Sequence, residues 1–392
     1  MQREAKGEAV YYFAKQQLVF LVSVFFVWCL LGFEQTYGQQ ASPQSSTADQ
    51  EAETADRSDS EEQRETDEMP VFVSDSNTGY IDNAIIGTQF RVRADGGFGS
   101  NAPDRAEFFY GACGCARDVP NPPANVPNAN GDVLNPDAPG PSGTIIPGAI
   151  LTSPLIETEL DYQELRFDYE YAFRRNFSLF VEVPLRFIDG DVLGSQSGLG
   201  DVRAGFKWGL LDNPQHQLTF QLRGYFPTGD AEEGLGTDHA SIEPGLLYFG
   251  RLNERWTMAA ELRYFAPIDG TTGRGTGFSE DYAGDVLRYG LGFGYDFELA
   301  SGTRVTPVVE LVGWSVLGGL ALSSADGTPF GTTFPGFGYR ETDGENIANL
   351  KFGLRFAFRG RRSLYVGYGA ALTDDVWYDD VVRIEFRSAY GR

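Results

Sequence analysis

Charged side chains recur at every second position in several stretches of this sequence. Between residues 164 and 174 the acidic and basic side chains occupy one parity, and Leu, Phe and Tyr occupy the other. If the charged parity faces a water-filled interior, rings of mixed charge select permeants by size and charge; if the interior is narrow, paired charges fill it and hold it rigid. Both interpretations stay open. The candidate pore-lining residues are Glu164, Arg166, Asp168, Glu170, Arg203, Lys207, Arg223, Glu261, Arg263, Arg288, Glu310, Lys351, Arg355, Arg383 and Glu385.

A second candidate for chemistry is the tripeptide His239-Ala240-Ser241. Two positions apart on a strand, a histidine base lies within reach of a serine nucleophile, which is the arrangement of a lipase-like enzyme. The neighbouring Ile242 and Leu246 mark the lipid-facing parity, so both polar side chains are predicted to point inward, away from acyl chains. We therefore expect ordinary polarity at the rim and no enzymatic activity.

Three cysteines and two histidines limit the metal and redox chemistry. Cys113 and Cys115 form one Cys-x-Cys pair, and Cys29 lies in an apolar run near the N-terminus. In an oxidising compartment a local or intermolecular disulfide is the favoured interpretation of the pair. A two-thiolate metal site is less favoured because no histidine lies nearby, and no cofactor is expected.

The composition excludes two broad classes of protein. The chain has 392 residues and a formal net charge of −24, which argues against a nucleic-acid partner because phosphates require a basic surface. Its mean hydropathy of −0.27, with a single long apolar run, argues against a polytopic helical membrane protein. The 48 glycines and 14 % aromatic residues favour many strands joined by tight turns.

The N-terminal 70 residues differ from the rest. Basic residues precede an apolar run that ends at small residues, so residues 1–38 are predicted to be a cleaved signal peptide, with an uncut membrane anchor as the alternative. Residues 39–70 hold ten acidic residues against two arginines and almost no large apolar side chain, which predicts a disordered acidic linker. This linker could reach a periplasmic partner. Residues 71–392 form the predicted folded domain.

From residue 71 onward, alternation of apolar and polar residues predicts strands. Short turns alternate strictly with longer loops, and the segments are longer than typical strands of soluble proteins. These features favour an antiparallel up-and-down transmembrane β-barrel in the outer-membrane lipid over a soluble sandwich. No plug domain is expected between the linker and the first strand, which argues against an energised siderophore-type receptor. The predicted strands lie near residues 85–93, 161–174, 177–188, 200–211, 216–227, 240–251, 255–266, 286–299, 303–315, 346–359, 362–373 and 380–390.

Two further expectations concern particular side chains. Aromatic residues near segment ends are predicted to form the interfacial girdles; they are Phe173, Phe177, Trp208, Trp256, Tyr264, Trp377 and Tyr378. Pro184, Pro244 and Pro307 fall inside predicted strands, where each removes a hydrogen-bond donor. A closed barrel has no free edge, so we expect bulges or strand ends there.

The stretch Gly198–Trp208, with the sequence GLGDVRAGFKW, resembles the MetA-pathway-of-phenol-degradation family of transporter-like outer-membrane β-barrels. The stretches 225–230 and 287–292 carry the same resemblance, which covers roughly residues 160–390. It implies a bacterial outer-membrane barrel that passes aromatic or other small molecules. Three functions therefore stand as expectations: a passive channel for a small-molecule permeant, a non-transporting barrel that acts as a scaffold or anchor, and, remotely, a lipase-like enzyme. The sequence specifies neither the permeant nor the oligomeric state.

Overall fold

The computed structural model describes residues 76–100, 133–135, 144–146, 160–190, 194–231, 233–268, 283–300, 302–324, 337–358, 361–374 and 376–391. The predicted signal peptide, the acidic linker and the Cys113–Cys115 pair lie outside these ranges. Among the described residues, no helix has both the length and the apolar character needed to cross a bilayer.

Twelve long strands build the wall of a barrel. They are β1 (Thr88–Ser100), β4 (Leu160–Arg174), β5 (Phe177–Gly190), β7 (Val202–Asp212), β8 (His216–Phe226), β9 (Ala240–Arg251), β10 (Trp256–Ile268), β11 (Val286–Tyr295), β13 (Arg304–Val316), β16 (Asn346–Phe358), β17 (Arg362–Ala371) and β18 (Asp380–Gly391). Two short strands, β6 (Gly194–Leu199) and β12 (Phe297–Glu298), pair with β5 and β13. Outside the wall, β2 (Val133–Asn135) pairs with β3 (Thr144–Ile146), and β14 (Leu320–Ser324) pairs with β15 (Phe337–Glu341).

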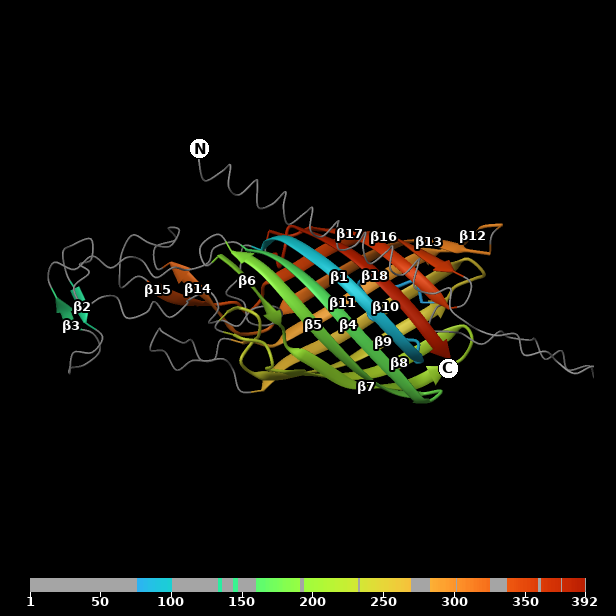
Figure 1. The fold of residues 1–392 in the computed structure, drawn as a ribbon, viewed down its shortest axis with the longest axis horizontal. Coiled ribbons are helices and arrows are strands. Elements are labelled where there is room, and N and C mark those ends of the chain that lie inside the picture. The colour runs from blue at the N-terminus through green and yellow to red at the C-terminus, as the bar shows by residue number, and fades with distance from the viewer. Residues whose placement is uncertain are drawn as a thin grey trace, which may run out of the picture. The chain divides into compact units, whose positions relative to one another are not determined.

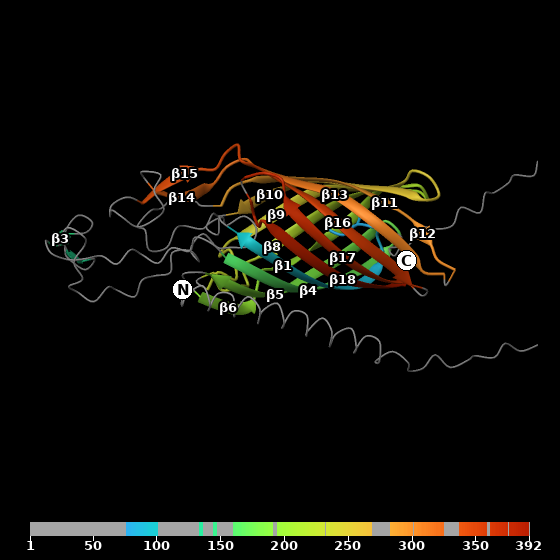
Figure 2. The same ribbon diagram turned by 90° about the horizontal axis from the view of Figure 1, so that it is seen from above.

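The sheet closes on itself, as Figures 1 and 2 show. Each wall strand pairs antiparallel with the next along the chain, and β1 pairs with β18. Closure leaves no unpaired strand edge in the wall, which is how a sheet satisfies its backbone groups in lipid. The predicted fold class and the twelve predicted strands are confirmed. The first strand begins three residues later than predicted and extends to Ser100.

The three prolines lie where the strand pairing is interrupted on one side. Pro184 lies where β5 changes its partner from β7 to β6, across the break at residues 200–201. The β9–β10 pairing skips Pro244, and the pairing of β13 with β11 and β12 skips Pro307. Proline has no backbone N–H, but at such a break the strand pairing loses no hydrogen bond because of it. The predicted irregularities are therefore present.

The two faces of the wall have opposite chemistry. Large apolar side chains, among them Phe167, Leu262 and Phe352, are exposed on the outer face. Most of the buried polar and charged side chains face the interior. A closed barrel that is apolar outside and charged inside matches hydrocarbon on one face and water on the other. The chain is therefore an integral outer-membrane β-barrel.

The girdle prediction is correct for most of its members and wrong for two. Phe173, Trp208, Trp256 and Tyr264 are exposed on the outer face near strand ends. Trp377 and Tyr378 are only 4 % exposed. They lie in the loop before β18, and Tyr378 packs near Tyr162 of β4 with ring centroids 6.4 Å apart. This long loop therefore folds inward, which the spacing of aromatic residues alone does not reveal.

Candidate functional site

The predicted pore-lining residues lie on the inner face of the wall, where all fifteen are largely or wholly shielded from solvent. Many of them pair with one another rather than pointing into open water. The Nζ of Lys207 lies 2.9 Å from Oε2 of Glu170, and Nε of Arg288 lies 2.7 Å from Oε1 of Glu261. The interior of the barrel therefore contains a dense network of ion pairs.

Several charged residues of this network were absent from the predicted set. They are Arg91, Arg93, Asp95, Glu182, Arg186, Glu243 and Arg387. The carboxylate of Glu385 receives hydrogen bonds from Arg93, Arg355 and Arg387 at 2.9–3.0 Å. The residues on β1 escaped notice because the alternation near the first strand is weak. For Glu182 and Arg186 the alternation in β5 was available as a signal.

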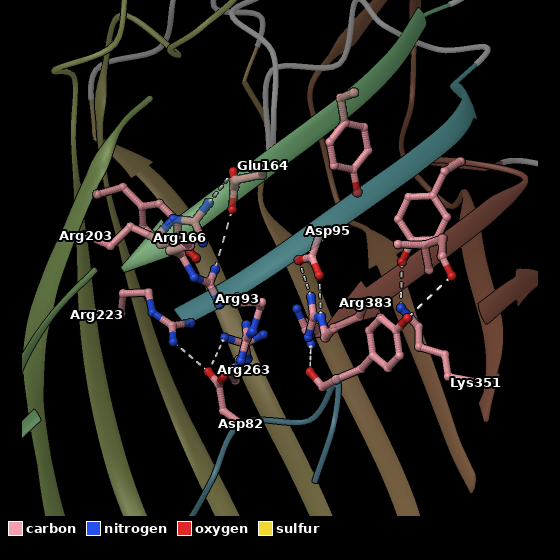
Figure 3. Close-up of a pocket in the computed structure, with 16 residues that line it drawn as sticks. Asp82, Arg93, Asp95, Glu164, Arg166, Arg203, Arg223, Arg263, Lys351 and Arg383 are labelled. Atoms are coloured by element: carbon pink, nitrogen blue, oxygen red, sulfur yellow. Dashed lines mark hydrogen bonds and ion pairs between the residues drawn. The ribbon is translucent and has the colours of Figure 1, made fainter. Parts of the chain in front are cut away.

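Residues 76–87, which we call the internal segment, occupy the barrel interior ahead of β1. The sequence predicted no plug domain before the first strand, and this short internal segment was not predicted. The segment approaches Arg387 near the short-turn end, reaches Glu310 in the middle of β13, and returns to Thr88 beside Ala172. Every side chain from Ser76 to Ile86 is buried. In Figure 3 the blue trace below the labelled side chains belongs to this segment and carries Asp82.

Charged side chains of the wall bind the backbone of the internal segment. The Glu310 carboxylate accepts hydrogen bonds from the backbone N–H groups of Gly79, Tyr80 and Ile81 at 2.8–3.1 Å. The next residue, Asp82, donates its N–H to Glu261 at 3.0 Å. These contacts supply the partners that a buried backbone requires in place of helix or sheet.

The carbonyl groups of the same residues are bound by cations. Arg355 donates to the carbonyl oxygen of Thr78, Arg383 to that of Gly79 and Arg288 to that of Tyr80. Farther along, Lys207 donates to the carbonyl oxygen of Asn83 at 2.9 Å. The alternation of acidic and basic groups on the wall thus matches the donors and acceptors of one extended chain.

Asp82 is the one charged side chain of the internal segment. Its Oδ2 lies 2.6 Å from Nη2 of Arg223 and 2.9 Å from Nη1 of Arg263. Burial alone raises the pKa of a carboxyl, but the nearby guanidinium groups of Arg223, Arg263 and Arg288 outweigh it and hold the pKa of Asp82 well below its usual range. Asp82 is therefore an ionised anchor for the segment.

Glycines on the wall make room for the internal segment. A Cβ added to Gly290 would lie 3.0 Å from Cγ1 of Ile81, and one added to Gly292 would lie 3.2 Å from its Cδ1. Gly79 itself packs against the ring of Tyr365, where an added Cβ would come within 2.0 Å of Cζ. The alternating glycines of β11 thus have a steric role inside the barrel.

A cavity of about 60 Å³ lies against Tyr80 and Asp82 of the internal segment. Figure 3 shows the charged side chains that converge on it from several strands. Its lining contains eight arginine or lysine residues, three carboxylates and four tyrosines. At about 30 Å³ for each molecule in the liquid, this volume corresponds to about two waters.

The other predicted candidate was the pair of His239 and Ser241. His239 and Ser241 are buried and point inward, as predicted. Nδ1 of His239 lies 2.8 Å from the carbonyl oxygen of Thr237. Among the described residues, no group of three or more His, Cys, Asp or Glu side chains could hold a metal ion.

Comparison with known proteins assigns the family. The sequence profile of the family described as "Putative MetA-pathway of phenol degradation" matches residues 152–376, more than half of the chain. The chain belongs to this family. The match confirms the resemblance carried by Gly198–Trp208 and its supporting stretches.

The chain is also similar in architecture to solved outer-membrane barrels. The COG4313 outer membrane channel from Pseudomonas putida F1 aligns with a TM-score of 0.45 at 13 % identity, over 80 % of this chain and 100 % of that one. The β domain of the Bordetella autotransporter BrkA gives 0.40 at 13 % identity, over 78 % and 100 %. The Pseudomonas putida toluene transporter TodX gives 0.32 at 10 % identity, over 77 % and 88 %. No curated protein matches the sequence.

Proposed function

We propose that this barrel is a passive channel for small molecules and that the internal segment closes it. The proposal depends on how residues 76–87 are attached to the wall. The contacts between this segment and the wall strands around it are hydrogen bonds and ion pairs. Such contacts exchange with water when the segment moves out, because each wall charge and each backbone group can be solvated instead. The wall strands pair with one another, so the barrel can persist while the segment moves.

The polar interior supports small, water-soluble permeants or those that carry a polar group. Charged side chains along a lumen select by charge and size. Passage of aromatic compounds, which the family description suggests, belongs to the same proposal. The proposed pore-lining set is the fifteen residues named from the sequence together with Arg93, Asp95 and Glu182.

The test compares the full-length protein with a variant that lacks residues 77–86, each purified and reconstituted into planar bilayers. The expected result is a severalfold larger single-channel conductance for the variant, because the ion pairs that close the lumen are gone. A matched control lacks ten residues of the acidic linker, such as 46–55, and should conduct like the full-length protein. Heat-modifiable gel migration verifies that each barrel is folded.

The second candidate is a non-transporting barrel that acts as a scaffold or anchor, and the filled lumen favours it. Under that function both proteins stay non-conducting and neither passes small solutes into liposomes. A folded variant without residues 77–86 that remains closed therefore rejects the channel proposal.

A further inference from the structure

More cationic than anionic side chains line the cavity beside the internal segment, although carboxylates behind the lining, such as Glu243, Glu261 and Glu385, pair with several of these cations. Eight cationic side chains and three carboxylates line it, although the chain as a whole has a net charge of −24. All three carboxylates are engaged. Asp82 pairs with Arg223, Asp95 receives two hydrogen bonds of 2.6 Å from Arg383, and Glu164 receives one of 3.0 Å from Arg186.

Arg203 is the least satisfied of these cations. It is 6 % exposed, yet its guanidinium makes no hydrogen bond to any described residue. Its ion-pair contacts to Glu164 and Glu182 are long, at 3.9 and 3.8 Å. Its Cζ also lies 5.3 Å from the ring centroid of Tyr225.

Lys351 lies on another wall of the same cavity, with Glu310 as its cross-strand neighbour, but it forms no ion pair within 4 Å with a carboxylate of the described residues. Its side chain is 2 % exposed. The ammonium group donates a hydrogen bond of 2.6 Å to the hydroxyl of Tyr378 and lies 4.0 Å from the ring centroid of Tyr80. Figure 3 shows Arg203 and Lys351 at opposite sides of the cluster, with Arg93 and Arg383 between them.

A buried cation is costly when its carboxylate neighbours are too distant for hydrogen bonds, and the cost falls when an anion binds it directly. A guanidinium presents its N–H groups in a planar fork that matches carboxylate and phosphate oxygens. The tyrosine hydroxyls add neutral donors beside these charges. The cavity volume of about 60 Å³ limits the ligand to a small anion or to an anionic group of a larger molecule.

We propose that this cavity is a binding site for a small oxyanion, a carboxylate or phosphate group, held by Arg203 and the neighbouring cations. The site is independent of conduction, because it is formed while the internal segment is in place. A closed barrel can therefore bind the anion, and failure of the channel proposal leaves this one intact.

The test is calorimetric titration of the full-length protein in detergent with sodium acetate, and separately with inorganic phosphate, at constant ionic strength. We expect saturable binding of at least one of them with a stoichiometry near one. Acetate alone assigns a carboxylate ligand, phosphate alone a phosphate ligand, and both assign a general oxyanion site. Chloride is the anion of the balancing salt, and it must bind more weakly than the oxyanions do. A site that binds chloride equally well is not specific for oxyanions.

Arg203→Gln removes the unsatisfied guanidinium, and we expect it to weaken binding by about tenfold or more, the usual effect of a lost charge-assisted hydrogen bond. Lys351→Gln is a second variant from another wall, in case the first fails to fold. Arg174→Gln is the matched control, because Arg174 is an exposed arginine at the short-turn end of β4. Absence of saturable binding to either anion, or unchanged affinity in both folded cavity variants, overturns the proposal.

Discussion

At the residue scale, one carboxylate carries much of the attachment of the internal segment. Glu310 accepts three backbone hydrogen bonds inside the barrel. Hydrogen bonds to a charged group contribute about 1.5–3 kcal/mol each, and a buried donor left without a partner costs about 1–3 kcal/mol. We expect Glu310→Gln to destabilise the docked segment by about 2–4 kcal/mol. The amide has one acceptor oxygen where the carboxylate has two, and its NH2 group would face the backbone N–H groups of the segment.

The measurement for Glu310→Gln is hydrogen exchange of residues 79–81 together with conductance. Faster exchange at these amides and more frequent opening are expected. Glu298→Gln, which changes an exposed glutamate on β12, is the control and should alter neither. Equal exchange in Glu310→Gln and the full-length protein contradicts the role assigned to this carboxylate.

Asp82 gives a pH prediction. Its pKa is held well below the ordinary 3.8 by Arg223 and Arg263, despite burial. A lowered folded-state pKa contributes stability that is complete above the unfolded-state value and is lost as the pH falls through the folded-state value. The anchor should therefore hold the segment equally well from about pH 8 to about pH 5, and weaken only below the ordinary carboxyl range.

The measurement is the open probability of the unmodified protein and of Asp82→Asn at each pH. The difference between the two reports the titration of Asp82 alone, although Glu182 and Glu243 contact the same Arg223. The difference between the two proteins should stay constant down to about pH 5 and shrink in more acidic solution. A difference that disappears between about pH 7 and pH 5 would show that Asp82 titrates in its ordinary range or above.

At the element scale, the wall was predictable and the internal segment was not. In β4 and β5 the side chains alternate between apolar and polar with period two. A shift of the strand register by one residue would turn every charged side chain toward lipid, so the sequence specifies these strands strongly. Residues 76–87 have no such period. Their conformation is set by wall groups distant in the chain, such as Glu310 and Arg383, which no local pattern encodes. The cluster Tyr80-Ile81 and Ile85-Ile86 among small polar residues was the available signal of burial.

The lipid-facing parity gives a prediction for β11. Leu291 is 43 % exposed and lies near the middle of this strand, opposite Ala260 and Leu311. Arginine at the bilayer midplane of a barrel costs about 2–4 kcal/mol and much less near the interface. We expect Leu291→Arg to lower the free energy of unfolding by that amount in urea titrations of the protein in lipid vesicles.

The matched control for that measurement is Leu299→Arg, which lies beyond β12 in a short turn. It should cost about 1 kcal/mol or less. If both substitutions cost the same, the depth assigned to β11 in the bilayer is wrong.

At the scale of the whole molecule, net charge and local charge have opposite signs. The acidic linker contributes a net −8 to the total, whereas the cavity within the barrel is lined mainly by cations. Net charge argued against nucleic acid as a partner, but it gave no information about the lumen, because the sign of the charge there depends on which side chains face inward. The sequence thus predicted which charged side chains face inward. Only the three-dimensional structure shows that arginines outnumber carboxylates around the cavity.

This excess predicts the ion selectivity of the channel once residues 77–86 are removed. The deletion takes away Asp82 and leaves eight cations against two carboxylates around the former cavity. A constriction lined mainly by one sign of charge concentrates the opposite ion, so the variant should prefer anions. The measurement is the reversal potential in a potassium chloride gradient, and Arg203→Gln in the same deletion background should shift it toward zero. A preference for cations would mean that the carboxylates of the wall, such as Glu182 and Glu243, control the open lumen instead.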